Sequence, residues 1–207
     1  MVEIKGTKYF LISFLLFVII ASSLLFFFSK AEIQIVINQS NTPFFDFFFK
    51  NITHLGTGYL LGILFFATIF KNKKFAFKTL LSSILMFGIV LILKLKIFSE
   101  RPVTFFKYSY NTDYHFHFVN GVNIHNYNSF PSGHTATAFT LFLLLSILFH
   151  SKNKILQFVF FALALLVGYS RMYLMQHFLT DVIAGSIIGV VCVYFSNFVI
   201  NKIFKND

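Results

Sequence analysis

Two residues of this chain have the spacing that nucleophilic catalysis requires. His177 and Asp181 are four residues apart, so that on a helix the carboxylate can hold one imidazole nitrogen while the other nitrogen faces an electrophile. Arg171 lies close enough in sequence to offer a planar, charged fork to phosphate oxygens. We interpret this segment as a nucleophile with its orienting carboxylate and an anion-binding arginine. A structural His–Asp pair on a helix is the alternative.

A second polar segment, Pro131-Ser132-Gly133-His134, stands where a long apolar run begins. A helix that starts there directs unpaired backbone N–H groups and the positive end of its dipole at an anion, and Gly133 lets the backbone approach closely. Ser132 could instead cap the helix, and His134 could be an interfacial histidine. In the context of the first segment, we infer an anion-binding helix start.

The third polar segment contains Lys94 and Arg101 and closes another apolar run. These residues are seven positions apart, which is about two helical turns, so we expect them to share one face of a helix. Both side chains could then bind the same dianionic group. A lysine that anchors the end of a helix at the membrane surface is the alternative interpretation.

Taken together, the three segments resemble the signature of the type 2 phosphatidic acid phosphatase superfamily. The family patterns K-x6-R-P, P-S-G-H and S-R-x5-H-x3-D are met here residue for residue. One departure is Val103, which stands where a second arginine often follows the proline. The resemblance therefore implies the core chemistry but not a substrate contact in that loop. The resemblance covers the chain from about the second predicted span to the end and implies a six-helix membrane fold.

The resemblance also implies a double displacement without a metal or any other cofactor. His177 would attack phosphorus and become a phosphohistidine, and Asp181 would orient the ring and stabilise its positive charge. His134 would protonate the leaving group and later activate water. The residues implied to hold the phosphate oxygens are Lys94, Arg101, Ser132, Gly133 and Arg171.

These residues are compatible with four functions to different degrees. Hydrolysis of a phosphate monoester or diphosphate on a membrane lipid leads, because a site at the membrane face favours a substrate that arrives laterally. A lipid phosphotransferase would use the same residues and stays open. A vanadate haloperoxidase fits less well with a membrane chain, and a channel or transporter would not need His177. The open substrates are undecaprenyl diphosphate, phosphatidylglycerol phosphate, phosphatidic acid and a lipid A phosphate.

The elements that must position these residues are membrane-spanning helices. Of 207 residues, 57% are hydrophobic and only 12% are charged, and the charged residues cluster between long apolar runs. We expect an all-α, polytopic membrane protein that forms a single domain over residues 1–207. It would have six spans and an extra interfacial helix between the first two spans. The predicted spans are Tyr9–Ser29, Leu55–Phe70, Thr79–Phe98, Thr135–Phe149, Ile155–Ser170 and Val182–Ile200.

The distribution of lysines predicts that both chain ends are cytoplasmic, because basic residues are enriched on that side. The lysines on the predicted cytoplasmic side are Lys5, Lys8, Lys71, Lys73, Lys74, Lys78, Lys152, Lys154, Lys202 and Lys205, with His150 in the same connections. All three polar segments then fall at the opposite ends of the spans. The small size of the chain and its richness in Phe, Ile, Lys and Asn, which suggests an AT-rich genome, favour a bacterial inner membrane. The active site would then lie on its periplasmic face.

The remaining features indicate no other class of function. The net charge of +10 does not indicate a nucleic-acid partner, since the basic residues lie at span ends rather than in one stripe. Cys192 lies alone in an apolar run and has no partner thiol. We expect the lipid substrate and the bilayer as partners, and no obligate protein partner.

Two segments on the outer side complete the prediction. The segment from Lys30 to His54, dense in phenylalanine, is predicted to be an interfacial helix that either lines a lipid entrance or packs at headgroup level. His115, His117 and His125, with Asp113 nearby, lie in a long outer loop. Their spacing matches no common zinc pattern, so we expect a solvated or loop-packing role.

Overall fold

The computed structural model describes residues 7–149 and 153–204, and within those ranges it contains no β-strand. The α-helices are α1 (Lys8–Phe27), α2 (Lys30–Gln39), α3 (Pro43–Ile52), α4 (Tyr59–Ile69), α5 (Lys73–Lys96), α6 (Pro102–Thr104), α7 (Gly133–Leu148), α8 (Lys154–Tyr173) and α9 (Leu179–Ile203). A 3-10 helix, η1, spans Thr53–Gly56, and a π-helical turn, η2, spans Phe105–Ser109. The all-α prediction is confirmed.

Helix length and composition support four membrane spans, α1, α5, α8 and α9, rather than the six that we expected. A fifth is added if α3, η1 and α4 count as one span, although this unit bends by 48° at a break before Tyr59. α7 is apolar but has only 16 residues. The count differs because the predicted second span is broken and the predicted fourth span is short.

Helix α5 begins earlier than predicted, which changes the place of several topology-determining lysines. The side chain of Asn72 accepts a hydrogen bond from the backbone of Phe75 at 3.0 Å and caps the helix. Lys73, Lys74 and Lys78 therefore belong to the first turns of α5 and not to a loop. Other positions used in the topology prediction lie outside the described residues: Lys5, His150, Lys152 and Lys205.

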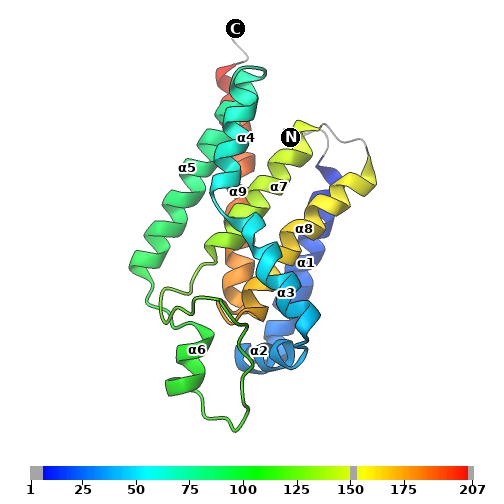
Figure 1. Cartoon of the computed structure of the whole chain (residues 1–207). Helices are drawn as coiled ribbons and strands as arrows, with labels where there is room; N and C mark the ends of the chain where they lie inside the picture. The colour runs from blue at the N-terminus through cyan, green and yellow to red at the C-terminus, as the bar shows by residue number, and fades with distance from the viewer. Residues whose placement is uncertain (1–6, 150–152, 205–207) are drawn as a thin grey trace.

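Helix α7 lies inside the bundle, packed against α5, α8 and α9 (Figure 1). Two glycines of α9 permit a close approach: a Cβ at Gly185 would overlap the carbonyl oxygen of Ser132, and one at Gly189 would overlap that of Ala136. At the end of this contact the backbone N–H of Ser132 donates to the carbonyl of Asp181 at 3.0 Å. The start of α7 is thereby fixed to the start of α9.

The segment predicted as one interfacial helix forms two helices, α2 and α3, near the lower end of the bundle in Figure 1. Ser29 and Glu32 form a capping box that starts α2, and Thr42 followed by Pro43 starts α3. Phe49 anchors α3 to α8, with its ring centroid 4.6 Å from that of Tyr173. This region covers the end of the bundle where the polar segments lie.

Candidate active site

His177 lies in the short connection between α8 and α9, directly before the second helix. The backbone N–H groups of Gln176 and His177 both donate to the carbonyl of Arg171, at 2.9 and 3.1 Å, and close the turn. Phe178 is the N-cap of α9 and Asp181 is its third residue. The expectation that His177 and Asp181 share a helix is therefore wrong. They meet because a helix N-terminus brings its third residue back over the residues that precede it.

The carboxylate of Asp181 is held in place by several donors. Its Oδ2 accepts from the backbone N–H of Phe178 at 3.0 Å and from the hydroxyl of Ser129 at 2.5 Å. The same oxygen lies 3.4 Å from Nδ1 of His177. This contact directs the other ring nitrogen, Nε2, away from the carboxylate and leaves it free to act as a nucleophile.

Both members of this pair are buried, His177 with 2% and Asp181 with 3% of its surface exposed. Burial lowers the pKa of His177 below its ordinary value, an effect larger than the opposing influence of the Asp181 carboxylate. The positive charge of Arg171 acts in the same direction as burial. His177 is therefore neutral near pH 7, which is the form that has a lone pair to donate.

Arg171 brings a permanent positive charge into the interior. Its side chain is 8% exposed, and its Nη1 donates to the hydroxyl of Thr53 at 2.8 Å. Its Nε–H has no hydrogen-bond partner among the residues that the structure describes, and no carboxylate within those residues pairs with it. A buried guanidinium that has neither a paired carboxylate nor a partner for its Nε–H is suited to binding an anion.

Lys94 and Arg101 do not share a helix face as we expected. α5 ends at Lys96, and Arg101 is extended, with φ −82° and ψ 162°, as residues before a proline tend to be. Both side chains instead reach the segment that precedes α7, where Lys94 Nζ donates to the carbonyl of Asn128 at 2.5 Å and Arg101 Nε to that of Tyr127 at 2.9 Å.

Arg101 also contacts the residue next to the candidate nucleophile. Its Nη1 donates to the backbone and side-chain oxygens of Gln176, at 3.2 and 2.9 Å. Burial lowers the pKa of Arg101 and the Asp181 carboxylate raises it, so its charge acts within the same site. Lys94 is also near enough to Arg101, Asp181 and Arg171 to interact electrostatically with them.

The start of α7 supplies the remaining predicted residues. The Oγ of Ser132 accepts from the backbone N–H of Thr135 at 3.4 Å and from its hydroxyl at 2.8 Å, so Ser132 caps the helix, the alternative we considered. A Cβ at Gly133 would meet only Val90, at an ordinary 3.7 Å, so crowding by the protein does not require glycine there. His134 interacts electrostatically with Arg171, His177 and Arg101. The three segments thus converge on one site.

Comparison with known proteins decides the family. The family model described as the PAP2 superfamily matches residues 75–205, which is more than half of the chain and includes all three polar segments. The chain belongs to the PAP2 superfamily.

Three similar proteins accompany this PAP2 assignment. The lipid A 4'-phosphatase of Porphyromonas gingivalis is 28% identical over 174 residues, or 80% of this chain and 70% of that protein. The crystal structure of Aquifex aeolicus LpxE has a TM-score of 0.67 and 30% identity, with 80% of this chain and 92% of that chain covered. The crystal structure of the first transmembrane PAP2-type phosphatidylglycerolphosphate phosphatase from Bacillus subtilis has a TM-score of 0.61 and 26% identity, with 93% and 96% covered.

The apolar helices and these relatives together show that this PAP2 protein is an integral membrane protein. Two residues of its site were missed by the sequence reasoning. Ser129, which donates to Asp181, and Thr53, which accepts from Arg171, belong to none of the three polar segments. Ser129 stands two residues before Pro131, so its nearness to a polar segment was the only signal; Thr53 gave none.

Of the outer-loop histidines, His117 contacts helices α2 and α3. His117 Nε2 lies 2.8 Å from the carboxylate of Asp46 on α3, and the same carboxylate accepts from the hydroxyl of Tyr173 at 2.6 Å. Asn38 of α2 bonds both the N–H and the carbonyl of His117. His117 therefore packs the loop onto the α2–α3 region, the role that we expected. His115 and His125 are exposed.

Proposed function

We propose that this protein is a lipid phosphatase that hydrolyses a phosphate monoester or diphosphate of a membrane lipid through a phosphohistidine on His177. The observation that carries the proposal is the buried Nε–H of Arg171, which lacks a hydrogen-bond partner among the described residues, beside a neutral His177. A buried cation without a carboxylate is costly unless an anion binds it. A phosphate ester supplies that anion and also the electrophilic phosphorus that a neutral imidazole can attack.

In the proposed first step, the lone pair of His177 Nε2 forms a bond to phosphorus as the bond from phosphorus to the lipid oxygen breaks. Asp181, behind Nδ1, stabilises the positive charge that develops on the ring. His134 gives its proton to the departing lipid oxygen. Water then attacks the phosphohistidine, His134 accepts a proton from that water, and phosphate leaves.

Catalysis of phosphoryl transfer depends mainly on positioning of the reacting groups and on electrostatic stabilisation of the transition state. We assign this role to the residues that gather around His177. The groups proposed to hold the phosphate oxygens are the side chains of Lys94, Arg101, Arg171 and Ser132 and the backbone N–H of Gly133. These cations provide the positive charge that a metal ion supplies in other phosphatases, so we propose a reaction without a metal or other cofactor.

We also propose that residues 1–207 form a single six-span domain, with the bent unit and the short α7 both crossing the bilayer and α2 lying at the interface. The cytoplasmic end would carry Lys73, Lys74, Lys154 and Lys202. The catalytic residues would then lie at the periplasmic face of a bacterial inner membrane. Support comes from the position of the catalytic segments at the helix ends opposite those lysines.

A phosphate monoester is the substrate class that the relatives favour. Two of the similar proteins are named for lipid A and for phosphatidylglycerolphosphate, and both names denote removal of a phosphate from a membrane lipid. A substrate that reaches the site laterally from the bilayer fits both. Undecaprenyl diphosphate and phosphatidic acid complete the set of substrates to compare.

The test is phosphate release by the purified protein in detergent, measured on those four lipids. We expect at least one lipid to be hydrolysed, His177→Ala to abolish release, and His125→Ala, which alters an exposed loop histidine, to leave it unchanged. Release that survives His177→Ala would contradict the proposal. Transfer of phosphate to an added alcohol in place of water would identify a phosphotransferase.

Removal of divalent metal ions is the companion test. We expect turnover to persist in EDTA, because protein cations already surround the phosphate. Vanadate should inhibit, since it adopts the trigonal bipyramidal shape of the transferring phosphoryl group. Loss of turnover in EDTA that one divalent ion restores would exclude the metal-independent mechanism.

A further inference from the structure

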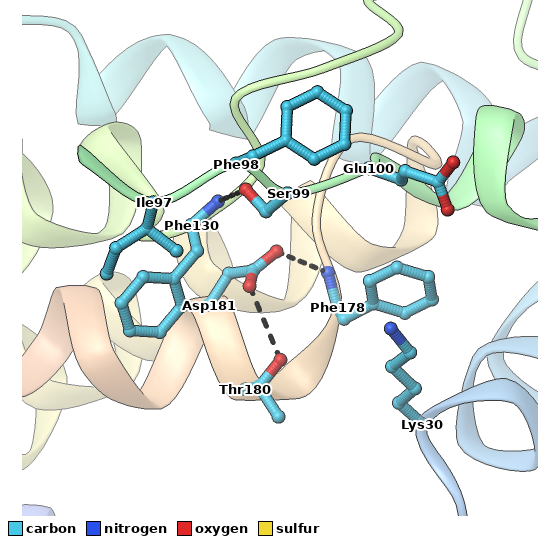
Figure 2. Close-up of a pocket in the computed structure, with 9 residues that line it drawn as sticks. All are labelled: Lys30, Ile97, Phe98, Ser99, Glu100, Phe130, Phe178, Thr180 and Asp181. Carbon is cyan, nitrogen blue, oxygen red and sulfur yellow. Dashed lines mark hydrogen bonds between the residues drawn. The ribbon is translucent and has the colours of Figure 1, made fainter. Parts of the chain in front are cut away.

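A cavity of about 420 Å³, here called the rear cavity, is lined by Asp181 and eight other residues. Figure 2 shows these residues. The wall of the cavity includes Asp181, Thr180 and Phe178 at the start of α9, Lys30 at the start of α2, and Glu100. Its size falls in the range of small-ligand sites. Among the described residues on this wall, Asp181 is the only one that the proposed mechanism uses.

This rear cavity is not where the substrate reacts. Asp181 faces Nδ1 of His177, so the attacked phosphorus must lie on the opposite side of the ring, near Nε2. In an in-line displacement the leaving lipid oxygen departs on the side of phosphorus away from the nucleophile, and so still farther from Asp181. The lipid that is hydrolysed therefore does not occupy the rear cavity.

Besides the Asp181 carboxylate, which faces His177, the rear cavity is lined by one positive group, Lys30, and one negative group, Glu100. Lys30 Nζ lies 4.2 Å from the ring centroid of Phe105 and 4.7 Å from that of Phe178. The Glu100 carboxylate accepts from the hydroxyl of Ser109 at 2.8 Å. Within the described part of the chain neither charge belongs to an ion pair. A ligand that carries both a phosphate and an amine would complement this pair of charges.

A separate apolar groove lies between α1 and α9 in the membrane-spanning region. It has a volume of about 470 Å³ and is lined by Leu25 and Phe26 of α1 and by Ile183 and Ala184 of α9, among others. Thr180 lines both the groove and the rear cavity, so the two adjoin. Lys30 follows the end of α1 by three residues, which places the charges at headgroup level and the groove at chain level.

We propose that the rear cavity and this groove together bind a zwitterionic phospholipid with a primary amine in its headgroup. Its phosphate would contact Lys30, its ammonium group Glu100, and one acyl chain would lie between α1 and α9. The distinction between this lipid and the substrate rests on the proposed function, whereas the binding itself requires no catalysis. A lipid in this position is a second, non-reacting ligand beside the catalytic pair.

The test is native mass spectrometry of the full-length protein in detergent, titrated with dioleoyl phosphatidylethanolamine or dioleoyl phosphatidylglycerol. We expect the ethanolamine lipid to bind more tightly. Lys30→Ala should weaken its binding about fivefold, the equivalent of about 1 kcal/mol for one charge contact at a membrane surface. Lys30→Arg should restore binding. Lys107→Ala is the matched control, because Lys107 is exposed, contacts the Tyr108 ring, and does not line the cavity.

Two further variants test the amine contact and the chain groove separately. Glu100→Gln keeps an acceptor for Ser109 but removes the charge, so it should abolish the preference for the ethanolamine lipid. Ala184→Phe should fill the groove and weaken both lipids, whereas Ala67→Phe on the exposed face of α4 should not. Equal binding by the unmodified protein and Lys30→Ala, or equal affinity of the unmodified protein for the two lipids, would overturn the proposal. Neither readout depends on phosphatase activity.

Discussion

Replacement of Asp181 by asparagine separates the structural role of this residue from its electrostatic role. The amide oxygen of asparagine can take the place of Oδ2 and still accept from Phe178 and Ser129, so the cap of α9 is retained. Its amide nitrogen would face the hydroxyl of Thr180, which lies 3.3 Å from Oδ1. The fold should therefore survive, while the negative charge behind His177 is lost.

The expected loss of rate follows from the geometry of the pair. Unit charges 3.4 Å apart attract by about 5 kcal/mol at an effective dielectric constant of about 20. The ring of His177 is only partly charged in the transition state, so we take about 4 kcal/mol, which corresponds to roughly a thousandfold in rate. Binding of the lipid phosphate should change little, because Asp181 faces the opposite side of the ring.

The assay is single-turnover phosphoenzyme formation by rapid quench in detergent, with lipid affinity measured separately on the same preparation. Asp181→Ala is the comparison: it should lose the same rate and in addition about 1 kcal/mol of stability, because the cap of α9 is removed. A loss below about tenfold for Asp181→Asn would refute the electrostatic role. An equal loss in lipid affinity would show that the site had been distorted.

Three other predictions concern the same site. His177→Ala should abolish phosphoenzyme formation. His134→Ala should accumulate phosphoenzyme with a nitrophenyl phosphate, because this leaving group needs no general acid whereas hydrolysis of the phosphoenzyme lacks its general base. Quenching each variant with labelled substrate and measuring the label on the protein distinguishes the two outcomes. Ser129→Ala should remove a charge-assisted hydrogen bond of about 2 kcal/mol, slow phosphoenzyme formation by roughly tenfold or more, and leave lipid affinity unchanged, whereas Ser129→Thr should preserve most of the rate. Because the pKa of His177 is lowered in the folded protein, the unfolded chain binds a proton at this residue more tightly than the folded protein does. The free energy of unfolding should therefore fall as the pH drops below about 6.5. Thermal unfolding of a His177→Asn variant should depend less on pH than that of the unmodified protein.

Much of this protein could be predicted from local chemistry. A long apolar run that lies in a bilayer has no water to bond its backbone N–H and C=O groups. These groups must therefore bond to one another within the segment, which requires a helix. The three polar segments are short and contiguous, so their residue types and spacing could be read without knowledge of the fold. Arg101 also had a local signal that our helix-face argument overlooked: Pro102 disfavours helical backbone at the residue before it.

Tertiary structure decided the features that depend on residues distant in sequence. The hydrogen bond from Ser129 to Asp181 and that from Arg171 to Thr53 join positions 52 and 118 residues apart, and no spacing rule connects such positions. The break before Tyr59 and the short α7 depend on packing, because a helix buried among others is held by its neighbours as well as by the bilayer. The sequence determined which chemical groups this protein has and that helices carry them. Only the packing of the helices, with the close contact of α7 and α9 at Gly185 and Gly189 at its centre, determined that those groups meet at one site.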